Sequence, residues 1–152
     1  MTVSQKGIDL IKSEEGLILH PYLDSAGIPT IGYGSTRWLT GKKVSMDDYP
    51  IDEETAENLL RNVVDGVAVE VDALITDKIN QNQFDALVSF AYNVGTGALK
   101  GSTLRKRVNA DPKDLPIRDA FLMWTKIHKD GKLVVLDGLV KRRKREADLY
   151  FS

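Results

Sequence analysis

The segment from residue 15 to residue 36, EGLILHPYLDSAGIPTIGYGST, constrains the fold more than any other part of the chain. Gly16 is typical of the position just past the C-terminal end of a helix, which would put Glu15 on the last helical turn. Two short, mostly apolar runs follow, separated by the turn sequence DSAG, and this pattern predicts a β-hairpin. The segment therefore predicts a helix that ends directly before a small antiparallel sheet.

The predicted hairpin carries an acid, Asp24, and a hydroxyl, Thr30, on either side of Gly27. A hairpin centred on Gly27 would pair these two residues, and directly paired side chains lie on the same face of a sheet. With Glu15 they would supply two carboxyl groups and a water-binding hydroxyl, which suits inverting glycoside hydrolysis with the carboxyl groups roughly 6.5–9.5 Å apart. Two acids and a threonine in a loop are also common as solvated surface residues, so the spacing alone does not decide.

The pattern E-x8-D-x5-T followed by IGYG resembles that of the phage-type lysozymes, glycoside hydrolase family 24. The resemblance implies an α+β, mostly α, lysozyme-like fold in a single domain, residues 1–152. A small β-hairpin lobe, at about residues 15–51, would be joined by a long helix to a helical lobe, residues 1–14 and 52–152. The active-site cleft would lie between the two lobes.

The implied activity is that of an endolysin, which hydrolyses the β-1,4 bond between N-acetylmuramic acid and N-acetylglucosamine in peptidoglycan during host cell lysis. Glu15 would protonate the leaving oxygen, while Asp24 and Thr30 would act on the attacking water with inversion at the anomeric carbon. In the family a histidine often follows the glycine-rich segment. Ser35 stands at that position here, so an ion pair from it is missing.

Residues 52–75 and 80–95 predict the two principal helices of the helical lobe, because apolar residues recur in them at helical spacing. The second segment, NQNQFDALVSFAYNVG, is similar to the family pattern Q-x-x-A-L-x-S-F-x-Y-N-x-G. Simple core packing is the alternative for Tyr92. The resemblance implies that four residues contact the glycan: Thr36, Tyr92, Asn93 and Thr103. We expect helix caps from Asp52, Asn80 or Asn82, Ser102 or Thr103, and Asp137.

The closing segment DGLVKRRKREADLY resembles the family's G-L-x-x-R-R-x-x-E helix. The residues that lead up to it, 129–137, predict a loop. Five consecutive basic residues spread over all faces of a helix, so at least one arginine would point inward and require a carboxylate. The resemblance implies that this arginine orients Glu15, with Arg142 the first choice and Arg145 the second. The basic run would also suit contact with the anionic bacterial envelope: Lys141, Arg142, Arg143, Lys144 and Arg145.

Composition narrows the class of protein further. The 152 residues contain no cysteine, which excludes disulfide frameworks and thiolate metal sites. His20 and His128 are too far apart in sequence to suggest a metal site, so we expect neither a metal nor a cofactor. Neither a signal peptide nor a transmembrane run occurs. We expect a monomer that stays in the host cytoplasm before release and acts in the periplasm or cell wall.

Charge is unevenly distributed along the chain. Residues 1–76 hold 6 basic and 13 acidic residues, while residues 77–152 hold 15 and 9, giving −7 and +6 and a net charge of −1. A basic half can steer toward an anionic polymer. The slightly acidic net charge of the whole chain, and the absence of aromatic residues within the basic run, argue against a nucleic-acid-binding protein. Two alternatives stay open: an inactive glycan-binding protein, and an enzyme whose basic C-terminal helix also disrupts membranes.

Overall fold

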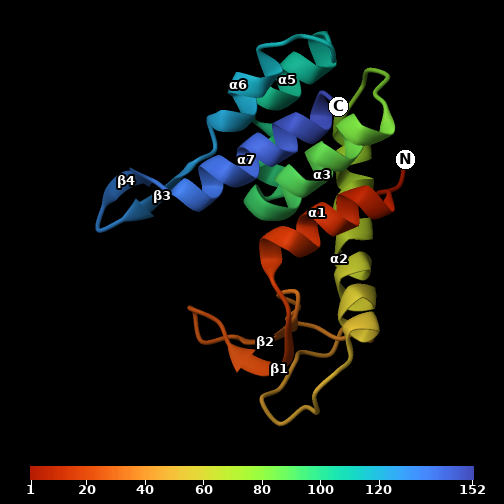
Figure 1. The fold of residues 1–152 in the computed structure, drawn as a ribbon, viewed down its shortest axis with the longest axis vertical. Coiled ribbons are helices and arrows are strands. Elements are labelled where there is room, and N and C mark those ends of the chain that lie inside the picture. The colour runs from red at the N-terminus through yellow and green to blue at the C-terminus, as the bar shows by residue number, and fades with distance from the viewer. The chain divides into compact units, whose positions relative to one another are not determined.

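The structure is a computed structural model that describes residues 1–152. Figure 1 shows its elements, which in chain order are α1 (Gln5–Glu15), β1 (Ile18–Leu23), β2 (Pro29–Gly32), α2 (Glu53–Leu74), α3 (Gln81–Val94), α4 (Thr96–Lys100), α5 (Thr103–Ala110), α6 (Ile117–Leu122), β3 (Lys126–Lys129), β4 (Lys132–Val135) and α7 (Asp137–Tyr150). The chain forms two compact units: a hairpin unit of residues 8–66, and a helical unit of residues 1–7 and 67–152. None of the helices combines the length and hydropathy that a membrane span requires.

The hairpin unit has a small apolar core beneath β2. The core residues come from β2, the following loop and α2: Ile31, Val44 and Leu59, with Trp38 and Ile51 packed against them. The Trp38 indole N–H donates to Asp48 Oδ2 at 2.9 Å, and the Ser45 backbone N–H donates to the same oxygen at 2.7 Å. The Ser45 N–H and the indole hold the pKa of Asp48 below its ordinary value. These bonds tie the loop between β2 and α2 to the core.

The register of hairpin β1–β2 differs from the predicted one. Thr30 pairs with Tyr22, so the predicted pairing of Thr30 with Asp24 is wrong. The loop is three residues long and ends on Gly27, whose φ of 76° lies in the left-handed region that favours glycine. The Asp24 backbone N–H donates to Ile28 O at 3.0 Å and closes this loop. The turn is therefore centred one residue earlier than Gly27.

The helical unit is built on the packing of α3 against α7. Asn80 caps α3 in a reciprocal capping box, which confirms one of the two predicted caps. The Phe90 ring meets the rings of Phe121 and Trp124 edge-on, each at 5.8 Å between centroids. Tyr150 of α7 meets Phe121 in the same way, also at 5.8 Å. The predicted apolar face of α3 is confirmed as buried: Phe84, Leu87, Val88 and Ala91.

The other predicted caps are confirmed in two cases and wrong in one. The Asp52 carboxylate accepts a backbone N–H of α2 at 2.8 Å, and the Ser102 hydroxyl accepts one of α5 at 3.0 Å. Asp137 does not cap α7, because it is the first residue inside the helix and Leu136 holds the cap position. Asp137 instead pairs with Lys141 one turn later, at 3.2 Å.

Strands β3 and β4 form a second hairpin where the sequence predicted a loop over residues 129–137. The turn consists of Asp130 and Gly131, whose φ angles are 52° and 74°. Two consecutive residues with positive φ are typical of a type I′ turn, and Asp-Gly is one of its preferred sequences. The prediction was wrong because this dipeptide, flanked by IHK and KLVV, is itself a hairpin signal.

Candidate functional site

Glu15 is the last residue of α1 and is half-buried. The helix ends because Gly16 has a φ of 71°, and its N–H donates to Lys12 O at 3.2 Å. A Cβ atom at Gly34 would lie 4.0 Å from Glu15 Oε2, so the carboxyl group reaches the loop that follows β2. The predicted placement of Glu15 at a helix end is confirmed.

Asp24 and Thr30 are joined through the backbone of Ile28. Asp24 Oδ1 accepts the N–H groups of Ala26 at 2.8 Å and Ile28 at 2.9 Å. The buried Thr30 hydroxyl donates to Ile28 O at 2.8 Å. The two predicted catalytic residues are thus held by one turn, although they are not cross-strand partners.

These bonds determine which atoms of the two side chains can act on a ligand. Both hydrogen bonds to Asp24 use Oδ1, so Oδ2 keeps its capacity to accept. Thr30 donates its single hydroxyl proton to Ile28, so toward a ligand its oxygen can only accept. Two acceptors of this kind can bind both protons of one water and leave a lone pair of that water free to attack. This arrangement suits general-base activation of a water.

A partly buried ionic network connects α1 to α2 in the hairpin unit. Lys12 Nζ lies 2.7 Å from Glu57 Oε1, and Arg61 Nε lies 3.2 Å from Glu57 Oε2. The Lys12 ammonium also stands 5.5 Å from the centroid of the buried Tyr33 ring. The Glu57 carboxylate raises the pKa of Lys12, and Lys12 together with Arg61 lowers the pKa of Glu57. This network fixes the last turn of α1, at a residue three positions before Glu15, against α2 and the residue after β2.

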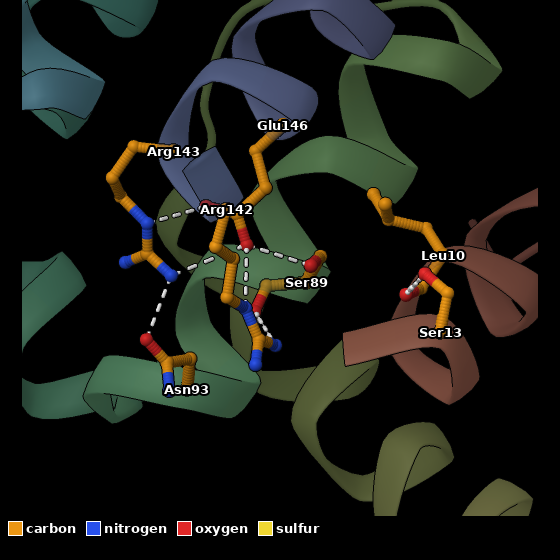
Figure 2. A network of polar contacts seen from close by, with 7 residues as sticks. All are labelled: Leu10, Ser13, Ser89, Asn93, Arg142, Arg143 and Glu146. Carbon is orange, nitrogen blue, oxygen red and sulfur yellow. Dashed lines mark hydrogen bonds and ion pairs between the residues drawn. The ribbon is translucent and has the colours of Figure 1, made fainter. Parts of the chain in front are cut away.

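A second, fully buried network lies between α3 and α7 (Figure 2). Arg143 Nε lies 2.8 Å from Glu146 Oε1, and both side chains are fully buried. Glu146 Oε2 accepts the Ser89 hydroxyl at 2.7 Å and lies 3.4 Å from Arg142 Nε. Burial raises the pKa of the Glu146 carboxyl, while the two guanidinium groups and the Ser89 hydroxyl oppose that shift.

Arg143 also sets the orientation of the Asn93 amide. Arg143 Nη2 donates to Asn93 Oδ1 at 2.7 Å, and Figure 2 shows the amide below the guanidinium group. A guanidinium can only donate, so the amide oxygen must face it and the amide NH2 remains to donate elsewhere. Asn93 is exposed, which makes this NH2 a candidate donor to an acceptor such as an acetyl oxygen.

The predicted substrate-binding residues fall in both units. Thr36, in the hairpin unit, is exposed. In the helical unit Tyr92 is half-buried near the end of α3, next to the exposed Asn93. Thr103 is the first residue of α5, and the cap bond is made by Ser102 instead. Contact of these residues with a glycan stays a prediction.

The basic run of α7 is divided between the interior and the surface. Arg142 and Arg143 are buried, which confirms that an arginine of this run points inward, whereas Arg145 is exposed. Glu146 is the carboxylate that pairs with both buried arginines within the helical unit. The predicted envelope contact through all five residues is therefore wrong for two of them. A role for Arg142 or Arg145 in orienting Glu15 stays a prediction.

Sequence reasoning missed the two acids that anchor these networks, Glu57 and Glu146. The spacing of Glu57 and Arg61, four residues apart on one helix, was a readable signal. The partner Lys12 lies on another helix, and nothing in the sequence joins it to Glu57. Glu146 stands within the closing motif, but its pairing with Ser89 depends on how α3 packs against α7.

No metal-binding cluster marks the site, and a cavity lies elsewhere in the helical unit. No group of three or more His, Cys, Asp or Glu side chains is arranged to hold a metal ion. A cavity of about 580 Å³ in the helical unit is lined by residues 77–80, 83 and 111–113. None of the predicted site residues lines this cavity.

Comparison with known proteins identifies relatives along the full chain. A family model described as phage lysozyme matches residues 12–146. The endolysin of Salmonella phage P22 is 39% identical over 100% of this chain and 99% of its own length. The endolysin of Bacillus phage B103 is 45% identical over 100% of this chain, which spans 55% of that protein. The solved structure of an endolysin from Escherichia coli O157:H7 phage FAHEc1 is 45% identical, with a TM-score of 0.91 over 99% of this chain and 93% of that one.

Proposed function

Because this chain belongs to the phage lysozyme family, we propose that it is an endolysin, a muramidase-type glycoside hydrolase that degrades host peptidoglycan during lysis. The predicted α+β, mostly helical lysozyme-like fold is confirmed by the likeness to the FAHEc1 endolysin. The observation that carries the proposed chemistry is the joint attachment of Asp24 and Thr30 to Ile28, in a unit where Glu15 ends a helix.

The proposed reaction is hydrolysis of the β-1,4 bond between N-acetylmuramic acid and N-acetylglucosamine. Glu15 donates a proton to the leaving oxygen. Asp24 Oδ2 and the Thr30 oxygen each accept a proton of the attacking water, and Asp24 removes one as the new bond forms. Attack from the face opposite the leaving group inverts the anomeric carbon. The Thr30–Ile28 hydrogen bond supports this role, because it leaves the threonine oxygen as an acceptor.

Substrate binding completes the proposed site. A general acid requires a raised pKa, and closure of the site by a bound glycan raises that of a carboxyl group by excluding water. The glycan contacts of Thr36, Tyr92, Asn93 and Thr103 belong to this proposal. Asn93 is exposed and its amide oxygen is bound by Arg143, which leaves the NH2 to donate and supports its contact with an acetyl oxygen.

The cellular setting is also part of the proposal. The enzyme acts as a monomer on the cell wall and stays in the host cytoplasm until the inner membrane is opened. Lys141, Lys144 and Arg145 are exposed and would contact the anionic envelope. Expression in a bacterial host should then cause no lysis until a membrane permeabiliser is added. Rapid lysis without permeabilisation would contradict cytoplasmic retention.

The test of the activity uses purified peptidoglycan and the variant Glu15→Gln. An amide cannot protonate the leaving oxygen, so this variant should keep the fold and lose turbidity reduction and reducing-end release. Asp24→Asn should lose as much activity or less, because the amide keeps part of the water-positioning capacity. Glu14→Gln is the matched control, since Glu14 is also half-buried on the last turn of α1 and should keep activity. Near-normal cleavage by folded Glu15→Gln would overturn the assignment.

A further inference from the structure

Hairpin β3–β4 is the most exposed regular structure of the helical unit. All eight residues of its two strands are exposed, including the aliphatic residues Ile127 at 38% and Val134 at 37%. Figure 1 shows the hairpin projecting away from the helices of this unit. A two-stranded hairpin is marginally stable alone and gains stability when one of its faces is covered.

The cross-strand pairs place two lysines opposite each other. Lys129 pairs with Lys132 across the turn. Ile127 pairs with Val134 two positions further from the turn. Because side chains alternate between the faces of a strand, these four residues share one face. Neither lysine forms an ion pair within the chain, and like charges in direct opposition destabilise a hairpin. An anionic group bound between the two ammonium groups would relieve that repulsion.

We propose that this face of the hairpin binds the free carboxylates of peptidoglycan peptide stems, and the proposal rests on the proposed function. The two lysines at the turn would hold a carboxylate. The adjacent aliphatic pair, Ile127 and Val134, would contact the methyl groups of the stem's alanine residues. The hairpin thereby serves as a binding arm for the peptide part of the polymer whose glycan part is cleaved.

Charge favours a peptide stem over an anionic lipid surface. A stem on a flexible polymer reaches the hairpin alone. Asp130, at the tip of the turn, suits the free amine of a diamino acid in the stem, a group that an anionic phospholipid such as phosphatidylglycerol lacks.

Binding is tested in the Glu15→Gln background, where cleavage does not remove the ligand. Binding to intact sacculi is measured by co-sedimentation, and binding to the soluble glycan strands that an amidase frees of their stems is measured by fluorescence anisotropy of labelled strands. The double substitution Lys129→Gln and Lys132→Gln should weaken binding to intact sacculi about fivefold, as the loss of two exposed ion pairs implies. It should leave binding to the stem-free glycan strands unchanged. The matched control replaces Lys106 and Lys113, which are also exposed, by Gln and should bind normally.

Kinetics with Glu15 intact give a second readout. The Lys129/Lys132 double variant should show a raised KM and an unchanged kcat on intact peptidoglycan, with no change on stripped glycan. Unchanged binding to intact sacculi would overturn the proposal, as would equal losses on both polymers. Lysine-dependent binding to vesicles of anionic phospholipid, in place of sacculi, would assign the face to lipid and also overturn it. Failure of the proposed function itself is distinct, because the wild-type chain would then cleave neither polymer.

Discussion

The substitution Lys12→Met separates the stability of the α1–α2 connection from its effect on catalysis. Methionine keeps the aliphatic stem but removes the ammonium group that lies 2.7 Å from Glu57 and 5.5 Å from the Tyr33 ring. The Lys12 and Glu57 side chains are 22% and 26% exposed, so solvent screens the pair. We expect a loss of about 0.5–1 kcal/mol in the free energy of unfolding, which is a decrease of about 2–4 °C in Tm.

The effect on turnover should be far larger than the effect on stability. Lys12 holds the last turn of α1, and Glu15 follows three residues later on that turn. A displacement of about 1 Å in a catalytic group costs up to about 100-fold in rate. We therefore expect kcat on purified peptidoglycan to fall about 10- to 100-fold, measured well below Tm, while KM changes little.

Arg118→Met is a close control for Lys12→Met. Arg118 makes an ion pair with Asp148 at 2.7 Å and stands 5.6 Å from the Phe151 ring, so it has the same two kinds of contact in the helical unit. Its loss should lower Tm by no more than Lys12→Met and leave kcat unchanged. Equal kcat values for the two variants would refute the positioning role of Lys12.

Acid titration checks the physical cause of the stability loss. Lys12 and Arg61 lower the pKa of Glu57 in the folded chain, so the stabilisation is present above the ordinary value of 4.5. It is lost as the pH falls through the lower, folded pKa. The difference in unfolding free energy between wild type and Lys12→Met should therefore shrink below pH 4.5. A difference that stays constant with pH would assign the loss to packing.

Three further predictions concern other parts of the molecule. Ser89→Ala should lower the free energy of unfolding, measured in urea, by about 1.5–3 kcal/mol, because the buried Glu146 carboxylate loses a hydrogen-bond donor. The control is Ser13→Ala, since the Ser13 hydroxyl donates to a helix carbonyl at the surface (Figure 2). This control should change the free energy of unfolding by less than about 0.5 kcal/mol. Equal losses would contradict the role of burial. Thr30→Ala should slow hydrolysis while the fold stays intact. For the wild type, NMR of the newly formed reducing end should show the α-anomer first. If the β-anomer forms first, Asp24 acts as a nucleophile. The lowered pKa of Asp48 means that its carboxylate stabilises the fold above about pH 3.8 and that this stabilisation is lost as the pH falls further. Asp48→Asn should therefore make the free energy of unfolding fall less steeply with pH below about 3.8. An unchanged acid limb in urea titrations would show that Asp48 contributes little.

The sequence predicted the elements of the site better than their pairing. The end of α1 at Glu15 follows from Gly16, a local signal, and the long helix follows from apolar spacing after Asp52. The hairpin register failed because the Asp24 side chain bonds to the turn backbone, which a count of residues about Gly27 does not include.

Long-range pairs were outside the reach of sequence reasoning. Lys12 and Glu57 meet only when α1 packs on α2, and Ser89 meets Glu146 only when α3 packs on α7. The inward arginine could be predicted, since five basic residues cannot all lie on one face of a helix. Its carboxylate partner within the helical unit, Glu146, lies three or four residues further along the same helix, which was readable as an ion-pair spacing but was missed.

The turn between β1 and β2 has a consequence for how this chain can vary in length. Surface turns usually accept inserted or deleted residues at little cost. Here Ile28 bonds backward to Asp24 and accepts the Thr30 hydroxyl, so the three residues between Asp24 and Ile28 determine how far apart the two side chains stand. One residue more or less would exchange the strand faces and separate the acid from the hydroxyl. Among the exposed loops of this enzyme, this one should be the least tolerant of insertions and deletions.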